Sequence, residues 1–192
     1  MHKMNKKEIR VGPYLYPMPV VLVGAIVNKK PNFMPIAWVS IVEHNPPMIS
    51  ISANQNHHTN QGIEENKAFS INTPDEKLII PTDYCGLKSG RDLDKSSVFE
   101  VFYGELKNVP MIKESPLNLE CEVVQTFDTQ KGHTIFIGEI KHAYADENIL
   151  QNGIPEITKL NPIIFSMNDN NYWKVGKHLG RAWSIGKNFE QK

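Results

Sequence analysis

The sequence predicts a mainly β fold, a barrel of short strands with a few short helices. Runs rich in Val, Ile and Phe alternate with polar residues along the chain and are separated by turn residues, as in small barrels. Few segments have the length and composition of a helix. With 192 residues and no repeat or evident linker, the chain is expected to form one domain with a substantial core.

The first predicted strand covers residues 20–27, a continuous apolar run typical of a strand that is buried on both faces, and residues 29–32 are its turn. Gly132, between Lys131 and His133, marks a hairpin. The other strands are expected at residues 36–42, 48–53, 68–72, 118–126, 134–143 and 163–167. Short helices are expected at residues 59–67, roughly 75–81 and 92–98.

The amino-terminal region superficially resembles a signal peptide, because basic residues precede an uncharged run from Val11 to Asn28. Pro13, Pro17 and Pro19 interrupt that run, and no small-x-small cleavage site closes it. It is also too short and broken for a membrane helix, so we expect neither a leader nor a membrane partner. Within the single domain, residues 1–10 are expected to be a flexible terminus and residues 181–192 a tail.

Charge and cysteine content narrow the class of partner. Lys plus Arg (21) equals Asp plus Glu (21), so no basic field is available to attract nucleic acid, and a small-molecule partner is favoured. The two cysteines, Cys85 and Cys121, do not form a Cys-x-x-Cys motif. This pattern indicates a reducing, cytoplasmic setting without a structural disulfide or a zinc site.

The stretch 85–95, Cys-Gly-Leu-Lys-Ser-Gly-Arg-Asp-Leu-Asp-Lys, is the most informative in the chain. Its glycines permit close approach of the backbone to a ligand. Ser89 offers a hydroxyl, Arg91 a planar fork of donors and Lys95 a point charge, which together suit a phosphate monoester. If a helix begins near Asp92, Arg91 and Lys95 lie one turn apart and face one anion. The alternative is an Asp-capped surface helix with solvated charges.

A second polar corner, residues 52–59, follows a predicted strand and precedes a predicted helix. Helix amino termini bind anions through free backbone N–H groups, and Thr59 is suited to be the N-cap or a phosphate hydroxyl. Two such corners indicate a phosphorylated cofactor and not a catalytic triad.

In this order along the chain, these motifs resemble the flavin reductase-like, flavoredoxin-type FMN-binding proteins. The resemblance runs from about Val11 to Gly180 and rests on residues 19–23, 32–40, 45–47, 52–59, 69–72, 85–95, 116–121, 136–139, 159–162 and 172–176. It implies an FMN-binding split β-barrel, usually a homodimer with flavin sites at or near the subunit interface.

The resemblance also implies the cofactor site. Backbone N–H groups around residues 35–40 and 52–54 are expected to hold the flavin ring and ribityl chain, and Thr59, Ser89, Arg91 and Lys95 the phosphate. The full expected set is Asn32, Met34, Pro35, Ala37, Trp38, Val39, Ser40, Ser52, Ala53, Asn54, His57, His58, Thr59, Cys85, Ser89, Gly90, Arg91 and Lys95. No catalytic side chain and no metal ligand are expected, because flavin N5 carries the chemistry.

Two functions follow from this resemblance. In the first, the protein is an FMN oxidoreductase that takes hydride from NAD(P)H and passes electrons to free flavin, ferric chelates or another acceptor. In the second, it is an FMN electron carrier reduced by a redox-protein partner. No Gly-x-Gly-x-x-Gly fingerprint occurs, so NAD(P)H is expected only as a transient donor. A weaker third reading is a barrel without flavin that serves as a binding module.

Several residues have two interpretations. Cys85 is either a thiolate favoured by Lys88 and Arg91 or, more commonly, a small buried hydrophobe, and Cys121 belongs to the core. Relatives often have Arg where this chain has His58, so a pH-dependent phosphate affinity near neutrality is a hypothesis.

The aromatic residues are similarly open. Trp38 is expected to wall the flavin ring, whereas Tyr172 and Trp173 either contact the cofactor or close the homodimer.

Overall fold

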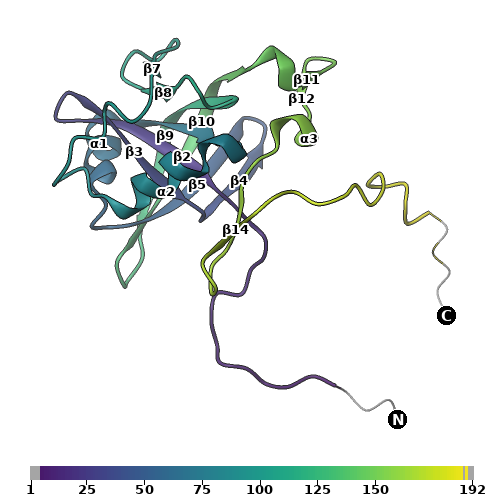
Figure 1. Ribbon diagram of the computed structural model, residues 1–192. Coiled ribbons are helices and arrows are strands. Elements are labelled where there is room, and N and C mark those ends of the chain that lie inside the picture. Colours follow the sequence, from purple (N-terminus) through teal and green to yellow (C-terminus); the bar gives the residue numbers. More distant parts are fainter. Residues whose placement is uncertain (1–4, 188, 190–192) are drawn as a thin grey trace.

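The computed structural model describes residues 5–187 and 189, and its centre is a curled, antiparallel, seven-stranded sheet (Figure 1). Its strand order is β3-β2-β6-β9-β10-β5-β4. The strands are β2 Val21–Val27, β3 Lys30–Ile36, β4 Val39–His44, β5 Pro47–Asn54, β6 Ala68–Thr73, β9 Leu117–Asp128 and β10 His133–Ala145.

The two edges of this sheet, β3 and β4, are joined by only two residues, Ala37 and Trp38. The sheet must therefore curl until its edges come close together, and the Ser52 N–H of β5 donates to the Trp38 carbonyl at 2.9 Å within this closure. Side chains from the strands fill the barrel, with Ile51, Phe69 and Phe136 almost completely buried, while β4 contributes only Val39 and is exposed beyond it.

The outer face of β2 and β3 is also covered. Leu22 and Phe33 pack there against Cys85 of the helix Ile79–Leu87, Phe99 of the loop after it and Ile112 of a short strand. Burial on both faces explains why β2 is a continuous apolar run with no polar alternation.

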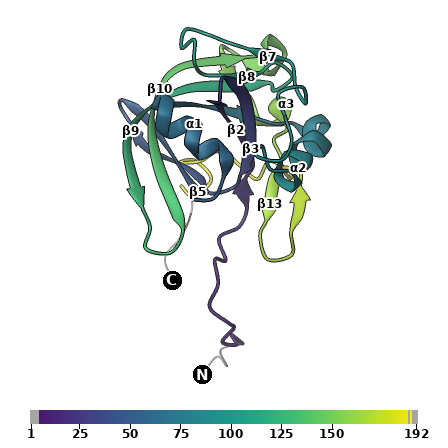
Figure 2. The same ribbon diagram turned by 90° about the vertical axis from the view of Figure 1, so that its left-hand side faces the viewer.

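Small sheets and short helices surround the barrel. The small sheets are β1 Met18–Pro19 with β13 Ile164–Ser166 and β14 Asn171–Trp173, β7 Val101–Phe102 with β8 Met111–Ile112, and β11 Leu150–Gln151 with β12 Ile154–Pro155. The helices are α1 His58–Asn66, α2 Ile79–Leu87 and α3 Ile157–Leu160, with single 3₁₀ turns at Glu76–Leu78 and Glu147–Ile149. The β9–β10 and β13–β14 hairpins project from the same side of the body (Figure 2).

Buried polar groups attach one long loop to the barrel. The Glu120 carboxylate of β9 is completely buried and accepts hydrogen bonds from the N–H groups of Glu105 and Leu106 and from the Tyr144 hydroxyl. A carboxylate that replaces its water shell in this way holds the loop tightly, because each bond is charge-assisted.

The mainly β class is confirmed, and the predicted strands occur within a few residues of their expected bounds. The turn at residues 29–32 is tighter than expected, because Asn28 and Lys29, both with positive φ, make the reversal and β3 already begins at Lys30. The strand predicted over residues 36–42 is interrupted at Ala37 and Trp38, where the chain passes from one edge to the other. The helix near residues 75–81 is longer, reaching Leu87.

The helix predicted over residues 92–98 is wrong, since these residues form turns. Two side chains in this segment make contacts that a helix would not allow. The Asp94 carboxylate accepts hydrogen bonds from Lys30 Nζ and from the Ser96 N–H, and the Lys95 side chain is buried. Such bonds offer the backbone an alternative to a helix.

The expected terminal segments lie partly outside the described residues, namely 1–4, 188 and 190–192. The described parts, residues 5–10 and 181–187, are exposed and contain no helix or strand. Within the described part of the chain, no helix has the length and apolar character needed to cross a membrane.

Candidate cofactor site

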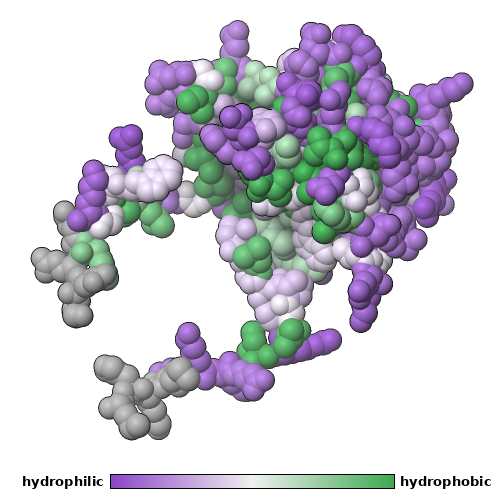
Figure 3. Space-filling view, turned by 180° about the vertical axis from the view of Figure 1, so that it is seen from behind, coloured by the Kyte–Doolittle hydropathy of each residue, from purple (hydrophilic) through white to green (hydrophobic). Residues whose placement is uncertain are grey.

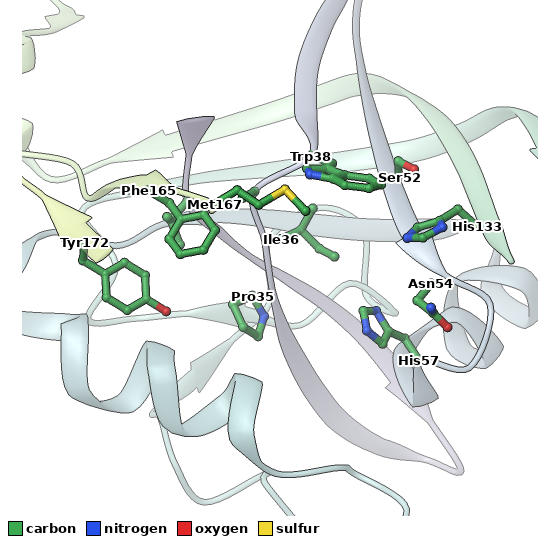
Figure 4. A pocket seen from close by; sticks show the side chains of 12 residues that line it. Pro35, Ile36, Trp38, Ser52, Asn54, His57, His133, Phe165, Met167 and Tyr172 are labelled. Atoms are coloured by element: carbon green, nitrogen blue, oxygen red, sulfur yellow. The ribbon is translucent and has the colours of Figure 1, made fainter. Parts of the chain in front are cut away.

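Two adjoining cavities lie where β3 ends and α1 begins. The first, here called the apolar cavity, has a volume of about 340 Å³ (Figure 4). Its walls come from β3 and the link after it, β5, the start of β10 and the β13–β14 hairpin. They are Val20, Pro35, Ile36, Ala37, Trp38, Ser52, Asn54, His57, His133, Phe165, Met167 and Tyr172.

The second, here called the polar cavity, has a volume of about 330 Å³ and shares Pro35 and His57 with the first. It lies between the amino terminus of α1 and the loop that follows α2. Its walls are Asn32, Met34, Pro35, Asn56, His57, His58, Thr59, Cys85, Gly86, Leu87, Lys88, Ser89, Gly90 and Lys95. The shared walls make the two cavities one elongated site with an apolar end and a polar end.

The apolar cavity has aromatic walls on opposite sides. The rings of Trp38 and His133 stack with centroids 4.9 Å apart and planes 29° apart. Figure 4 shows Phe165 and Tyr172 on the other side of Pro35 and Ile36, with the Met167 side chain extending from there toward Ile36 and Trp38. A slot between such walls is suited to a planar ring system.

Tyr172 is held in place by α2, since its hydroxyl donates to Asp83 Oδ1 at 2.9 Å. Burial and this hydrogen bond raise the pKa of Tyr172 to about 12. Trp173, the next residue, is mostly exposed, and its indole N–H donates to Ser166 Oγ. Tyr172 therefore lines the apolar cavity, whereas Trp173 does not.

Free donors gather at the polar end. The N-cap of α1 is His57, not Thr59, and the first N–H groups of the helix have no acceptor within it. Thr59 is buried and its Oγ1 accepts from Asn32 Nδ2 at 2.7 Å, which leaves the hydroxyl hydrogen of Thr59 for a ligand. The polar end is therefore suited to an anion.

Both histidines at this end are held toward the neutral form. Burial, followed by the charges of His133 and Lys95, lowers the pKa of His57. Burial, followed by the charges of Arg91 and Lys95, lowers the pKa of His58. A bound phosphate would oppose both shifts, because an opposite charge nearby favours the imidazolium.

Gly90 brings the loop after α2 into direct contact with β3 and α1. A Cβ at this position would lie 2.3 Å from Asn32 Oδ1 and 2.7 Å from His58 Cδ2, distances that no side chain tolerates. The glycine is needed for this close approach to Asn32 and His58, whereas the sequence predicted a close approach to a ligand.

Cys85 lies in α2 and is 2% exposed. Burial raises the pKa of its thiol and outweighs the opposing charge of Lys95. The structure therefore favours the buried hydrophobe over the thiolate. Cys121 is completely buried in the barrel, as predicted.

Most of the expected cofactor residues line the two cavities, and four do not. Ala53 is buried in the barrel, because alternation along β5 directs Ser52 and Asn54, but not Ala53, to the cavity. Val39 packs against the core, and Ser40 is exposed with its Oγ bonded to a backbone carbonyl. Arg91 lines an adjacent cavity of about 310 Å³ that shares Asn32, His58, Gly90 and Lys95 with the polar cavity.

Sequence reasoning missed other walls of the site. His133, Phe165 and Met167 come from hairpins far along the chain, and nothing local distinguishes them from ordinary strand residues. Asn56, Leu87 and Lys88 lie within the two predicted corners, but they were not among the expected cofactor residues.

Comparison with known proteins identifies the family. Residues 14–166 match the flavin reductase like domain. The chain belongs to the flavin reductase-like family. Among solved structures it is similar to flavoredoxin from Methanosarcina acetivorans, with 49% identity, a TM-score of 0.93 and coverage of 95% of this chain and 98% of that one.

Flavoredoxin of Desulfovibrio vulgaris (Miyazaki F) is 34% identical, with a TM-score of 0.88 and coverage of 95% and 100%. A putative flavin reductase with a split barrel domain from Shewanella frigidimarina is 20% identical, with a TM-score of 0.76 and coverage of 86% and 85%, and shows the fold alone. The fold is thus a split barrel, and this flavin reductase-like chain has a flavin-related redox function.

Proposed function

We propose that the protein binds FMN and uses it to accept hydride from NAD(P)H and pass electrons to free flavin, a ferric chelate or another small acceptor. One observation carries the proposal: an apolar slot with aromatic walls joins, through Pro35 and His57, a polar cavity at a helix amino terminus. A planar ring, a polyol chain and a phosphate follow one another in FMN in the same order.

When bound, FMN supplies the two-electron chemistry, and the protein supplies binding and orientation. Trp38 and the β13–β14 hairpin, which line the apolar cavity, would hold the flavin ring and exclude water from it. Ser52, Asn54 and Asn32 offer polar atoms along the middle of the site. Thr59, Ser89 and the start of α1 are the donors for the phosphate.

Two measurements test this proposal. The purified protein is expected to be yellow, and chromatography of the heat-released cofactor should identify FMN in preference to FAD. Rapid anaerobic mixing with NADH and with NADPH should then bleach the flavin absorbance. Recovery of haem, pyridoxal phosphate or FAD in place of FMN would refute the cofactor.

A second candidate function is an FMN electron carrier. The observation that favours it is the 49% identity to a protein named flavoredoxin over nearly the whole of both chains. If the FMN form is not reduced by NADH or NADPH but is reduced by a redox protein, the carrier function replaces the enzyme function.

Arg91 supports the phosphate from the adjacent cavity. It is exposed and forms no ion pair with any residue that the structure describes, so its guanidinium is available to an anion at the junction of the cavities. Arg91→Ala is expected to weaken FMN by about 1.5–3 kcal/mol, the scale of a hydrogen bond to a charged group. Asp94→Ala, which removes a half-exposed partner of Lys30, is the control and should matter less. If neither Arg91→Ala nor Asp94→Ala changes the affinity for FMN measurably, the charges of residues 85–95 belong to the protein surface and do not bind the phosphate.

We also propose a homodimer in a reducing, cytoplasmic setting, where Cys85 and Cys121 stay free thiols. Figure 3 shows apolar side chains gathered on one face between hydrophilic margins. Ile41 on the edge strand β4 is 63% exposed, and Val11 and Trp183 on the extended terminal segments are 97% exposed. Exposed apolar surface of this kind marks interfaces. Sedimentation should give about twice the chain mass of 21.8 kDa.

A further inference from the structure

Lys95 is a buried lysine that bonds only to carbonyl oxygens. It is 3% exposed, and its Nζ donates to the carbonyls of Phe33 at 2.7 Å, Cys85 at 3.1 Å and Lys88 at 3.2 Å. An ammonium group has three hydrogens, so all of its donors are engaged. Within residues 5–187 and 189, no carboxylate lies at ion-pair distance from this nitrogen.

The three carbonyls belong to two different elements. Those of Cys85 and Lys88 lie at the carboxyl end of α2, where carbonyls lack partners within the helix and the helix dipole is negative. The carbonyl of Phe33 belongs to β3, whose neighbouring residues Asn32 and Met34 line the polar cavity. Lys95 therefore joins the end of α2 to the barrel and fixes both ends of the loop that carries Ser89 and Gly90.

The charge of Lys95 acts on the polar cavity although its hydrogens do not point to a ligand. It contributes to the lowered pKa values of His57 and His58, which stand on the opposite wall. Burial in turn lowers the pKa of Lys95 itself, because the ammonium has no anion to offset its lost hydration. A cation in this position is stabilised by an anion that enters the cavity.

We propose that Lys95 is a positioning residue for the phosphate of the cofactor: its three carbonyl hydrogen bonds set the loop 88–95, and its charge attracts the phosphate without a direct hydrogen bond. This inference rests on the proposed FMN function. It differs from the expectation from family resemblance, in which Lys95 itself holds the phosphate.

The test compares FMN with riboflavin, which lacks only the phosphate, in the wild type and in Lys95→Met. The variant keeps the length of the side chain and removes its charge. We expect its affinity for FMN to fall by about tenfold, the order for a unit charge acting through partly screened space, and its affinity for riboflavin to fall by much less. Lys77→Met removes the same charge from an exposed site outside both cavities and should leave both affinities unchanged.

A pH profile gives a second readout that does not need a folded variant. The ratio of FMN to riboflavin affinity in the wild type should fall as the pH rises through the alkaline range and Lys95 loses its proton. Ionisation of the flavin ring cancels in this ratio. The groups facing Lys95 are His57, His58, Arg91 and Cys85. His57 and His58 have lowered pKa values and are already neutral in this range. The same profile of Cys85→Ala removes the contribution of the thiol, whose pKa is raised by burial. A flat ratio would overturn the role of the charge.

The outcomes separate the possible failures. If the wild type binds neither flavin, the proposed FMN function fails and this inference fails with it. If both flavins bind but Lys95→Met weakens them equally, the lysine only supports the fold and the inference alone is refuted. A crystal structure of the FMN complex should retain the three carbonyl bonds, and a hydrogen bond from Lys95 Nζ to the phosphate would contradict the proposal.

Discussion

Replacement of Gly90 by alanine tests whether the polar cavity depends on close contact between the loop and β3. The added Cβ would lie 2.3 Å from Asn32 Oδ1 and 2.9 Å from Asn32 Cγ. Asn32 cannot easily yield, because it is buried and donates to Thr59. The loop must therefore move away, or the hydrogen bond between Asn32 and Thr59 must break.

The size of the effect follows from these contacts. Overpacking of a dense site costs about 1–3 kcal/mol, and the lost hydrogen bond adds about 1 kcal/mol. Movement of the loop widens the gap between Ser89 and the start of α1, which both line the polar cavity. We expect Gly90→Ala to weaken FMN at least tenfold, which is about 1.4 kcal/mol.

Fluorescence quenching of FMN gives the affinity, and urea unfolding followed by tryptophan fluorescence gives the stability. Gly176→Ala is the matched control, because a Cβ at position 176 meets nothing within 4 Å. If Gly90→Ala binds FMN as the wild type does and unfolds at the same urea concentration, the loop is not held against Asn32 and the reasoning is wrong.

Three further predictions concern titratable groups. Glu120→Gln should lower the free energy of unfolding by about 3 kcal/mol, because the carboxylate of Glu120 accepts hydrogen bonds from two backbone N–H groups and an amide cannot satisfy both. Urea denaturation measures this loss. An unchanged midpoint of unfolding would contradict the prediction. Since burial raises the pKa of the Cys85 thiol, iodoacetamide at neutral pH should label Cys85 only after unfolding, and mass spectrometry can detect the label. Rapid labelling of the folded protein would instead support a reactive Cys85 thiolate. The pKa values of His57 and His58 are lowered in the folded chain, so the unfolded state binds more protons below about pH 6.5, and the free energy of unfolding should fall as the pH drops below that value. The double variant His57→Gln, His58→Gln should lose this pH dependence. If the double variant retains it, other groups cause the pH dependence.

The strands were predictable because each needs only a local pattern. β5 alternates buried and half-buried residues along its length, and β2 is apolar throughout because both of its faces are covered. The break at Ala37 and Trp38 was not predictable in this way. The break is imposed by the closing of the sheet, which brings together β3 and β4, the first and last strands in the order of the sheet.

The two ends of the site also differ in how far their residues could be predicted from local sequence. Each polar corner is a short continuous stretch, so Thr59, Ser89 and Gly90 stand out in the sequence as a group. The apolar cavity is assembled from the β13–β14 hairpin and the start of β10 against β3, and its members share no local motif. Its far wall is set by tertiary contacts such as the bond between Tyr172 and Asp83, which are 89 residues apart.

The stretch 85–95 shows how one wrong element changes the chemistry assigned to correct residues. In a helix, Arg91 and Lys95 would lie on one face and approach one anion together. As turns, the same residues separate: Lys95 is drawn under the loop to three carbonyls, and Arg91 remains exposed in the adjacent cavity. The two cations then support a phosphate in different ways. In the proposed complex, the attraction of the exposed Arg91 for the phosphate should weaken as the salt concentration rises, whereas that of the buried Lys95 should change little, because salt screens buried charges weakly.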